Sequence, residues 1–148
     1  MKYMFYESPV GRLTILLEDG VIRNVIFGHH VSDDGFNDDP VIGSKIFEEF
    51  DSYFSGQKKK FNLKFKPDGT DFQKDVWRVL LEIPYGETVS YSEIAERIGK
   101  PTAVRAVGTA CGSNPIPFII PCHRVISKSG SLTGYAGGIE NKKILLEF

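Results

Sequence analysis

The sequence predicts a mixed α/β (α+β) protein with two domains: a small N-terminal β-sheet plus helix domain at residues 1–67 and a C-terminal winged-helix-like helix-turn-helix domain at residues 68–148. Three features predict this architecture. Residues 2–27 alternate apolar and polar side chains between turn signals, as strands do. Two short helical patterns joined by a glycine-containing turn begin at residue 90. The turn-rich stretch 67–70 separates the two halves.

Composition and cysteine usage define the setting of the protein. The chain has 148 residues, 41% hydrophobic and 25% charged, which is typical of a globular protein. Polar and charged residues begin too early for a secretory signal peptide, and no apolar run is long enough to span a membrane. Two cysteines, Cys111 and Cys122, are too few for a disulfide framework. We therefore expect a reducing, intracellular setting, cytoplasmic or (in a eukaryote) nuclear, without a membrane partner.

Charge is unevenly distributed along the chain. Residues 1–87 contain 11 Lys and Arg against 15 Asp and Glu, a balance of −4. Residues 88–148 contain 7 against 4, a balance of +3. A mildly basic C-terminal half could meet a polyanion, although such a small surplus is also common on surfaces that bind nothing. Charge alone is therefore only a weak indication of nucleic-acid binding.

The N-terminal half is predicted to begin with strands and a loop. The alternating stretches KYMFYES, LTILLE and VIRNVIF, separated by turn signals, predict a hairpin or meander. Residues 28–43 are polar and turn-rich and are predicted to form a surface loop. His29 and His30 in this loop could bind a metal, but no ordered ligand spacing supports a site, so a solvated loop is favoured.

A helix and one more strand are predicted to complete this half. Residues 42–57 have apolar side chains at helical spacing, namely Ile46, Phe47, Phe50 and Phe54. Residues 58–69 then predict one more strand with a basic lead-in, in which the three lysines 58–60 form a solvated turn.

Three helical patterns follow in the C-terminal half. Thr70 and Gln73 have capping-box spacing, and one apolar face follows them, made of Phe72, Val76, Leu80 and Ile83. Ser90 and Glu93 have the same spacing, and Gly99 ends the helix that they begin. After a short turn, Thr102 is expected to cap the next helix. This pattern matches a helix-turn-helix, although many helical hairpins share it.

The last of these helices has two different faces. Its small residues would pack on the preceding helix: Ala103, Ala106, Val107 and Ala110. Arg105 lies on the opposite, low face, so one long cation could enter a groove or the base stack while the helix approaches a phosphate backbone. Local capping or pairing of Arg105 is the alternative. The candidate DNA-contacting residues are Thr102, Ala103, Arg105, Gly108, Thr109 and Gly112.

IPFIIPCHRVIS, residues 116–127, places Cys122 and His123 side by side. A buried thiol is usually an inert small hydrophobic group, and this interpretation suits Cys111 better than Cys122. The thiolate is the reactive form, and the neighbouring His123 and Arg124 are groups of the kind that lower the pKa of a thiol. Adjacent side chains diverge, however, so His123 would need a bridging water or a tight turn to accept the thiol proton.

Two other chemistries remain open for these residues. Cys111, Cys122 and His123 lack the paired spacing of a structural zinc site, so we predict no metal. A cysteine hydrolase with Asn114 as its third member is also conceivable, but its triad geometry cannot be established from a sequence.

Several motifs of the C-terminal half occur together in a known family. They are RAVG at 105–108, GSNP at 112–115, PCHRV at 121–125 and GYAGG at 134–138. Over residues 70–146 the chain resembles the O6-alkylguanine-DNA alkyltransferase family, and before that it agrees only in general layout. The resemblance implies transfer of an alkyl group from O6 of a flipped guanine, or more weakly from O4 of thymine, in double-stranded DNA to a cysteine. It implies no cofactor and one reaction per molecule, and we expect a monomer.

The resemblance also implies roles for individual residues. Cys122 is the alkyl acceptor, and His123 is the water-bridged base that makes its thiolate. Asn114 braces the active-site turn, and Tyr91 helps to rotate the nucleotide and can donate a proton to the departing base. Arg105 fills the gap left in the duplex. The implied pocket wall is Pro117, Val125, Tyr135 and Ala136, with the main-chain carbonyls of Cys122 and Val125 reading the guanine amino group.

One departure from the family pattern bears on activity. In that pattern a Leu-Leu pair and two further residues precede a glutamate that completes the Cys-His-water relay. Here Leu145 and Leu146 are followed by Glu147 and Phe148. Glu147 would have to substitute by a change of register, or thiolate formation would be weaker. A non-catalytic module that flips and flags alkylated bases therefore stays open, although Cys122 argues against it, as does a transcriptional regulator with the same helix-turn-helix.

Overall fold

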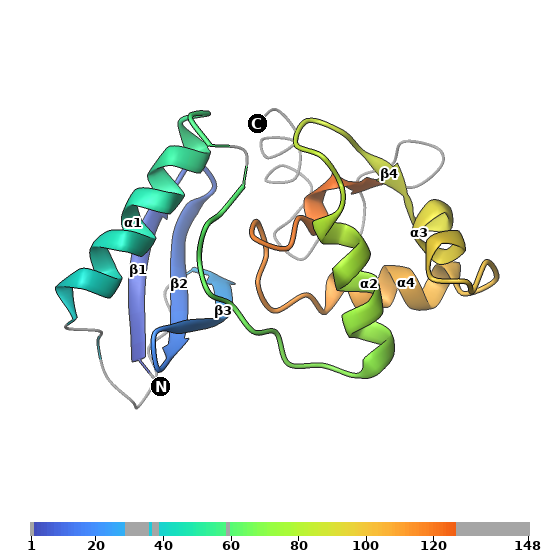
Figure 1. The fold of residues 1–148 in the computed structure, drawn as a ribbon, viewed down its shortest axis with the longest axis horizontal. Helices are drawn as coiled ribbons and strands as arrows, with labels where there is room; N and C mark the ends of the chain where they lie inside the picture. Colours follow the sequence, from blue (N-terminus) through green and yellow to red (C-terminus); the bar gives the residue numbers. More distant parts are fainter. Residues whose placement is uncertain (1, 29–35, 37–38, 59, 127–148) are drawn as a thin grey trace. The chain divides into compact units, whose positions relative to one another are not determined.

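The alternating N-terminal segments form an antiparallel sheet in the order β1-β2-β3, with strands Lys2–Ser8, Gly11–Glu18 and Val21–Phe27. The computed structural model describes residues 2–28, 36, 39–58 and 60–126, and the chain divides into two compact units, Met1–Pro67 and Asp68–Phe148. Both units contain helices and strands, which confirms the predicted mixed class (Figure 1). His29 and His30 lie outside the described residues.

Two tight turns set the register of this sheet. Ser8 pairs with Gly11 across the first turn, and the Ser8 hydroxyl donates a hydrogen bond of 2.7 Å to the Gly11 carbonyl. Asp19 and Gly20 form the second turn with φ of +52° and +79°. Positive φ at both positions is the geometry that two-residue hairpins favour, because its twist matches that of the strands. The predicted meander is therefore confirmed.

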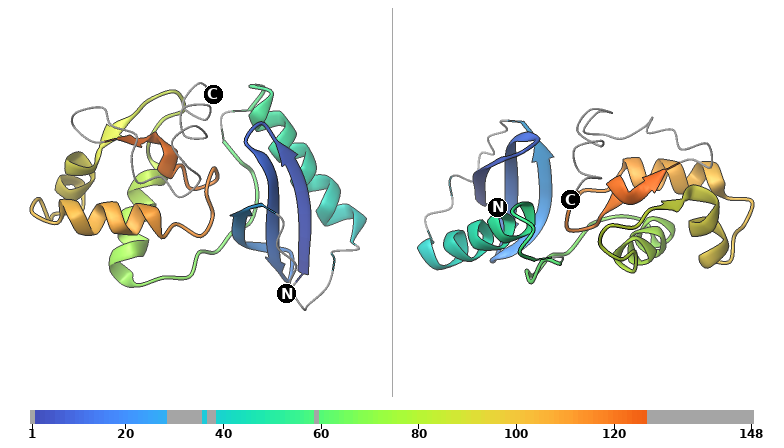
Figure 2. Two further views of the ribbon diagram at one scale, coloured as in Figure 1. Left: turned by 180° about the vertical axis from the view of Figure 1, so that it is seen from behind. Right: turned by 90° about the horizontal axis from the view of Figure 1, so that it is seen from above.

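Helix α1, Pro40–Phe54, covers one face of the sheet (Figures 1 and 2). The Tyr6 ring lies 5.2 Å from the Phe50 ring and 6.1 Å from the Phe54 ring, between centroids, and the Tyr6 hydroxyl donates a hydrogen bond of 2.6 Å to Asp51. Phe47, predicted on the same apolar face, is 49% exposed at its edge. An aromatic cluster between the sheet and α1 thus forms the core of this unit.

The helix begins inside the stretch that was predicted to be a loop. The Asp39 carboxylate accepts hydrogen bonds from the Val41 and Ile42 amides, and Pro40 occupies the first turn. An Asp N-cap followed by Pro is a strong start signal because Pro lacks the amide that would otherwise need a partner. The Asp-Pro dipeptide therefore extends the helix beyond the predicted start at residue 42.

The strand predicted over residues 58–69 is reduced to one bridge. Phe65 bridges to Ile22 in the parallel sense, and the Ile22 amide and carbonyl bond to Lys64 and Lys66 at 3.0 and 2.9 Å. The alternation itself is present, because Phe61, Leu63 and Phe65 are less exposed than the residues between them. The segment is extended along the sheet but does not pair over its length.

A buried carboxylate joins α1 to this segment. Glu49, predicted only as part of a helix, is 3% exposed and accepts hydrogen bonds from the Lys58 ammonium and the Asn62 amide, with Lys45 3.9 Å away. Burial alone would raise the pKa of Glu49, but the bonds from Lys58 and Asn62 outweigh it and lower the pKa below its usual value. Lys58 is therefore part of an ion pair rather than of a solvated turn.

The C-terminal unit begins with helix α2, Asp71–Leu81, which starts at the predicted capping box. The Gln73 amide donates to Thr70 Oγ1 at 3.1 Å, and the Thr70 amide donates to Gln73 Oε1 at 2.9 Å. Farther along α2 the buried Trp77 donates its indole N–H to the Ala110 carbonyl at 2.9 Å. This bond fixes α2 against α4, the helix Val104–Gly112.

Helices α3, Tyr91–Arg97, and α4 form the predicted helix-turn-helix pair. Ser90 caps α3 by accepting from the Glu93 amide at 3.1 Å, as predicted. Gly99 has φ of +76°, and the Lys100 amide bonds to the Ala95 carbonyl at 2.9 Å, which is the Schellman ending that favours glycine. Among the described residues, no helix combines the length and the apolar character needed to cross a membrane.

Two expectations about α4 were wrong. Thr102 does not cap it, because the N-cap residue is Ala103 and no side chain accepts a hydrogen bond there. Ala106 is exposed rather than packed, because the buried face of the helix runs through Val107, Ala110 and Cys111.

Two short strands connect the beginning of α3 to the cysteine-containing segment. Strand β4, Val89–Ser90, pairs in parallel with β5, Val125–Ile126, which directly follows the 3₁₀ turn η1, Cys122–Arg124. This pairing aligns Val89 with Val125 and Ser90 with Ile126. Residues more than thirty positions apart in sequence, at Tyr91 and Cys122, are thereby attached to the same small sheet.

We predict that Glu49→Gln lowers the free energy of unfolding at pH 7 by about 1–3 kcal/mol, because it leaves the Lys58 charge without its buried partner. A carboxylate whose pKa is lowered by folding stabilises above its unfolded pKa, and this contribution is lost as the pH falls through the folded pKa. The difference between the variant and wild type should therefore shrink as the solution is acidified.

Urea unfolding followed by circular dichroism at neutral and acidic pH measures this difference. The matched control is Glu48→Gln, which removes an exposed carboxylate of the same helix and should change little. Equal effects of the two substitutions would contradict the assignment of the ion pair.

Candidate active site

Cys122 opens the turn η1 and is 6% exposed. Pro121 precedes it with φ of −81°, and the Cys122 amide donates to the Ile120 carbonyl at 2.8 Å. The Arg124 amide closes the turn on the Pro121 carbonyl at 3.1 Å. The proline fixes φ and has no amide to donate, so a preceding helix or sheet ladder cannot run through it and the turn begins here. The thiol thus starts a tight, buried turn, which we call the acceptor turn (Cys122–Arg124).

Asn114 braces the loop that leads into the acceptor turn. Its Nδ2 donates to the Ile120 carbonyl at 2.8 Å, and its Oδ1 accepts from the Ile116 amide at 2.9 Å. Ile120 and Ile116 are both buried, so these backbone groups would be costly without a partner. One side chain therefore holds both ends of the apolar loop before Cys122.

His123 occupies the middle of the acceptor turn and is 1% exposed. A 3₁₀ turn has about three residues per turn, so successive side chains point roughly 120° apart. His123 and Cys122 are therefore adjacent in sequence but directed differently. The Cys122 carbonyl accepts the Val125 amide, which uses one of its two lone pairs.

Tyr91, the first residue of α3, lies close to the acceptor turn. Its ring packs over Gly108, since a Cβ built on that glycine would be 4.0 Å from Tyr91 Cδ1. Burial raises the pKa of Tyr91 above that of an exposed tyrosine, and the negative charges of ionised Cys111 and Cys122 raise it further. The phenol therefore keeps its proton to a higher pH than an exposed tyrosine does.

Cys111 is the residue of this site to which the sequence assigned no role beyond packing. It is 6% exposed in α4, three residues after Gly108, and its carbonyl accepts the Asn114 amide at 3.3 Å. The helical spacing from Gly108 to Cys111 is the signal that would have placed the thiol next to Tyr91.

The outer face of α4 carries the candidate DNA contacts. Arg105, Thr109 and Gly112 are exposed, and Gly108 is half-buried beneath Tyr91. At the start of the helix, Thr102 is exposed and Ala103 is half-buried. Among the described residues the Arg105 guanidinium has no ion pair or hydrogen bond, so local pairing does not hold it. The face is low because Gly108 and Gly112 have no side chain, and the space around Gly112 is open.

Two of the four expected pocket-wall residues can be located. Pro117 is buried and bridges to Ile120, and Val125 is fully buried in β5. Between Pro117 and Ile120, Phe118 has φ of +73°, a conformation that a bulky residue adopts only when its surroundings hold it. Tyr135 and Ala136 lie outside the described residues, as does Glu147.

The sequence suggested Arg124 only as a cationic neighbour of the Cys122 thiol, but its guanidinium binds another segment of the chain. It is 7% exposed, its Nη1 donates to the Ile83 carbonyl at 3.0 Å, and its guanidinium lies 5.5 Å from the centre of the Tyr85 ring. Both partners belong to the loop between α2 and β4. No signal in the sequence pairs Arg124 with a carbonyl so far away along the chain.

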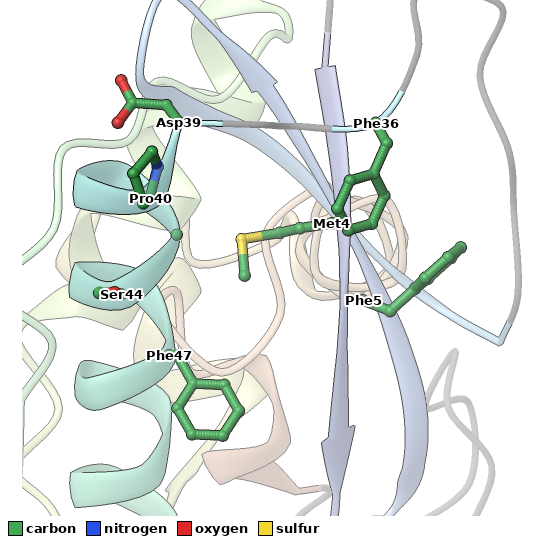
Figure 3. A pocket seen from close by; sticks show the side chains of 8 residues that line it. Met4, Phe5, Phe36, Asp39, Pro40, Ser44 and Phe47 are labelled. Carbon is green, nitrogen blue, oxygen red and sulfur yellow. The ribbon is translucent and has the colours of Figure 1, made fainter.

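A pocket in the N-terminal unit contains none of the predicted site residues. Figure 3 shows its wall, where Met4 of β1 points toward the first turns of α1; the hollow has a volume of about 290 Å³. It is mainly apolar, with Met4, Phe36 and Phe47 among the residues that line it. In the part of the chain that the structure describes, no three His, Cys, Asp or Glu side chains are grouped to hold a metal ion.

Comparison with known proteins covers both units. Residues 71–148 match the family model described as 6-O-methylguanine DNA methyltransferase, DNA binding domain. Residues 1–67 match the model described as 6-O-methylguanine DNA methyltransferase, ribonuclease-like domain.

Individual relatives match over nearly the whole chain. The methylated-DNA–protein-cysteine methyltransferase of Mycobacterium tuberculosis H37Rv is 47% identical over 150 residues, which cover 99% of this chain and 91% of that protein. Its namesake from Methanosarcina barkeri is 46% identical and covers 99% of this chain and 96% of that protein. The crystal structure of Mycobacterium tuberculosis OGT in complex with DNA matches with a TM-score of 0.90 at 46% identity, covering 99% of this chain and 91% of that chain.

We predict that Asn114→Ala loosens the acceptor turn and lowers the free energy of unfolding by about 1–3 kcal/mol, because the buried Ile116 amide loses its partner and the Ile120 carbonyl loses one of two. Hydrogen exchange measured by mass spectrometry should be faster over residues 116–124. The matched control, Asn62→Ala, changes an exposed side chain and should leave that exchange unaltered. Unchanged protection in the Asn114 variant would contradict the bracing role.

Proposed function

The chain belongs to the 6-O-methylguanine DNA methyltransferase family, and we propose that it repairs alkylated DNA by moving the alkyl group from O6 of guanine onto its own Cys122. O4-alkylthymine is a weaker substrate in this proposal. The observation that supports it most is the buried acceptor turn, which is braced by Asn114 and is followed by β5, the partner of the strand that leads into Tyr91. The protein acts as a monomer on double-stranded DNA and requires no cofactor.

The proposed reaction is a displacement at saturated carbon. The Cys122 thiolate attacks the alkyl carbon, a sulfur–carbon bond forms, and the bond between that carbon and O6 breaks. The electron pair stays on O6, and the departing guanine takes up one proton. The thioether that results has no proton to lose and is a poor leaving group, so each molecule reacts once.

Cys122 is a better acceptor than the second thiol, Cys111. Cys122 begins a turn next to a histidine, whereas Cys111 lies within α4 on the buried face that includes Val107 and Ala110. His123 takes the thiol proton through a bridging water in this proposal, because neighbouring side chains of a 3₁₀ turn diverge. A water-bridged base is sufficient, since only the thiolate has to be formed before attack.

Tyr91 supplies the proton that the departing base needs. Its raised pKa keeps the phenol protonated at neutral pH, so it is available as a donor. Its attachment to β4, which pairs with β5 directly after the acceptor turn, holds the donor close to the thiol.

The exposed face of α4 brings the lesion to the thiol. An alkylated base inside a stacked duplex cannot be reached, so the nucleotide has to be rotated out at a cost of about a few kcal/mol. Arg105 stands on a low helix face without a partner among the described residues, which suits insertion into the gap that the nucleotide leaves. Thr102, Ala103, Gly108, Thr109 and Gly112 complete the proposed contact with the DNA, and Pro117, Val125, Tyr135 and Ala136 the proposed base pocket.

Intact mass after incubation with a short duplex containing O6-methylguanine tests the function directly. Wild type should gain about 14 Da, the mass of one methylene, and the gain should saturate at one per molecule. Cys122→Ser should gain nothing, and Cys111→Ser should gain as wild type does.

The alternative outcomes separate the rival hypotheses. If wild type does not gain mass, active repair is wrong for this chain. If the protein then still binds the damaged duplex in preference to an undamaged one, the non-catalytic lesion-binding function replaces it. A gain of mass that follows Cys111 would move the acceptor to the second thiol.

We predict that Tyr91→Phe lowers the single-turnover rate at saturating damaged DNA by about 100-fold or more, because the departing base loses its proton donor. Since the pKa of Tyr91 is raised, the ratio of wild-type to variant rates should be the same from about pH 7 to pH 9. Quenched-flow measurement of alkylated protein gives both rates. A ratio that fell to one within this range would mean that Tyr91 has lost its proton and would contradict the assignment.

A further inference from the structure

We propose that Arg124 is a positioning residue for alkyl transfer: its buried guanidinium ties the acceptor turn to the loop that carries Tyr91, and so determines how the phenol faces Cys122. This inference rests on the proposed function. It concerns a residue that does not need to touch the DNA, and that the sequence suggested only as a cationic neighbour of the thiol.

The contacts of Arg124 hold it on the loop between α2 and β4. Its Nη1 donates to the Ile83 carbonyl at 3.0 Å, and its guanidinium lies over the Tyr85 ring at 5.5 Å. Ile83 is itself anchored, because it is buried and its amide bonds to the Leu80 carbonyl at 3.2 Å. Arg124 is therefore attached to the fixed end of α2 and not to a mobile chain.

The same loop leads directly to Tyr91. After Tyr85 it turns at Gly86, where φ is +82°, and the Glu87 amide bonds to the Pro84 carbonyl at 3.1 Å. It then forms β4, and Ser90 caps the helix whose first residue is Tyr91. Arg124 thus holds the beginning of the loop, while the β4–β5 pairing holds its end.

The β4–β5 pairing alone is a weak constraint. It joins only two residues of each strand, Val89 with Val125 and Ser90 with Ile126. Short isolated strand pairs are marginally stable, so a second attachment is needed to fix the loop. Arg124 provides it from the residue directly before β5, and its planar guanidinium can donate to a carbonyl and stack on a ring at once.

Removing the guanidinium should therefore change geometry more than DNA affinity. Small displacements of reacting groups can reduce a rate about 100-fold, because alignment is lost even though binding is kept. Arg124→Met preserves most of the apolar stem and removes the donors, whereas Arg124→Lys preserves the charge and one donor group but not the stacking plane. Arg78→Met on α2 is the matched control, since Arg78 is 69% exposed and pairs with Asp75 on the surface.

The experiment measures the single-turnover rate of alkyl transfer at saturating O6-methylguanine duplex, together with the Kd for that duplex. Fluorescence of Trp77, the only tryptophan of the chain, gives the folded fraction of each variant. We expect Arg124→Met to react about 10- to 100-fold more slowly than wild type per folded molecule, with Kd changed by no more than about twofold. Arg124→Lys should recover part of the rate, and Arg78→Met should react as wild type does.

A double-mutant cycle tests whether Arg124 acts through Tyr91. If it does, Arg124→Met should reduce the rate of Tyr91→Phe much less than it reduces the rate of wild type, because the group that it positions is already absent. If each substitution reduces the rate by the same factor whether or not the other is present, the proposal is overturned. It is also overturned if the unfolded fraction alone explains the loss of rate.

The outcomes also distinguish this inference from the proposed function. Wild type that gains no mass overturns the proposed function and the role of Arg124 in it. Active wild type with an equally active Arg124→Met variant overturns only the inference about Arg124.

Discussion

The carbonyl oxygen of Ile120 is the point on which the geometry of the candidate site depends. It accepts one hydrogen bond from Asn114 Nδ2 and one from the Cys122 amide, both at 2.8 Å. Residues 116–125 are all buried and form no extended sheet, so their backbone polar groups depend on such individual bonds. Because Asn114 follows Ser113, the C-cap of α4, the same carbonyl couples the end of that helix to the position of the thiol.

Tyr91 connects the two steps of the proposed chemistry, attack by the Cys122 thiolate and protonation of the departing base. Its ring lies over Gly108, its backbone follows β4, and the charges of the ionised thiols Cys111 and Cys122 contribute to its raised pKa. Burial raises the pKa of the Tyr91 phenol, so the phenol keeps its proton to a higher pH than an exposed tyrosine would. In the proposed function the half-buried Tyr91 and the buried Cys122 belong to one site, because β4, which leads into α3, pairs with β5, which follows the acceptor turn.

The N-terminal unit is stabilised by interactions of its own. Aromatic rings of β1 and α1 form its core, and the buried Glu49 carboxylate ties α1 to Lys58 and Asn62. None of the proposed catalytic or DNA-contacting residues belongs to this unit. The chemistry proposed for this chain is therefore assigned to residues of the C-terminal unit, in which local capping, helix packing and the acceptor turn are closely connected.

The sequence by itself determined the elements whose hydrogen bonds are local: the capping box at Thr70, the cap at Ser90 and the turn at Asp19. Each depends on partners within a few residues, so the pattern is sufficient to predict it. Asp39, followed by Pro40, is a local signal of the same kind and begins α1, whereas Thr102 has a capping side chain that the backbone does not use. Only the tertiary structure decided that Trp77 bonds to a carbonyl 33 residues away and Arg124 to one 41 residues away. Such bonds depend on how the helices pack, and no local pattern specifies which distant carbonyl will lie within reach of a side chain.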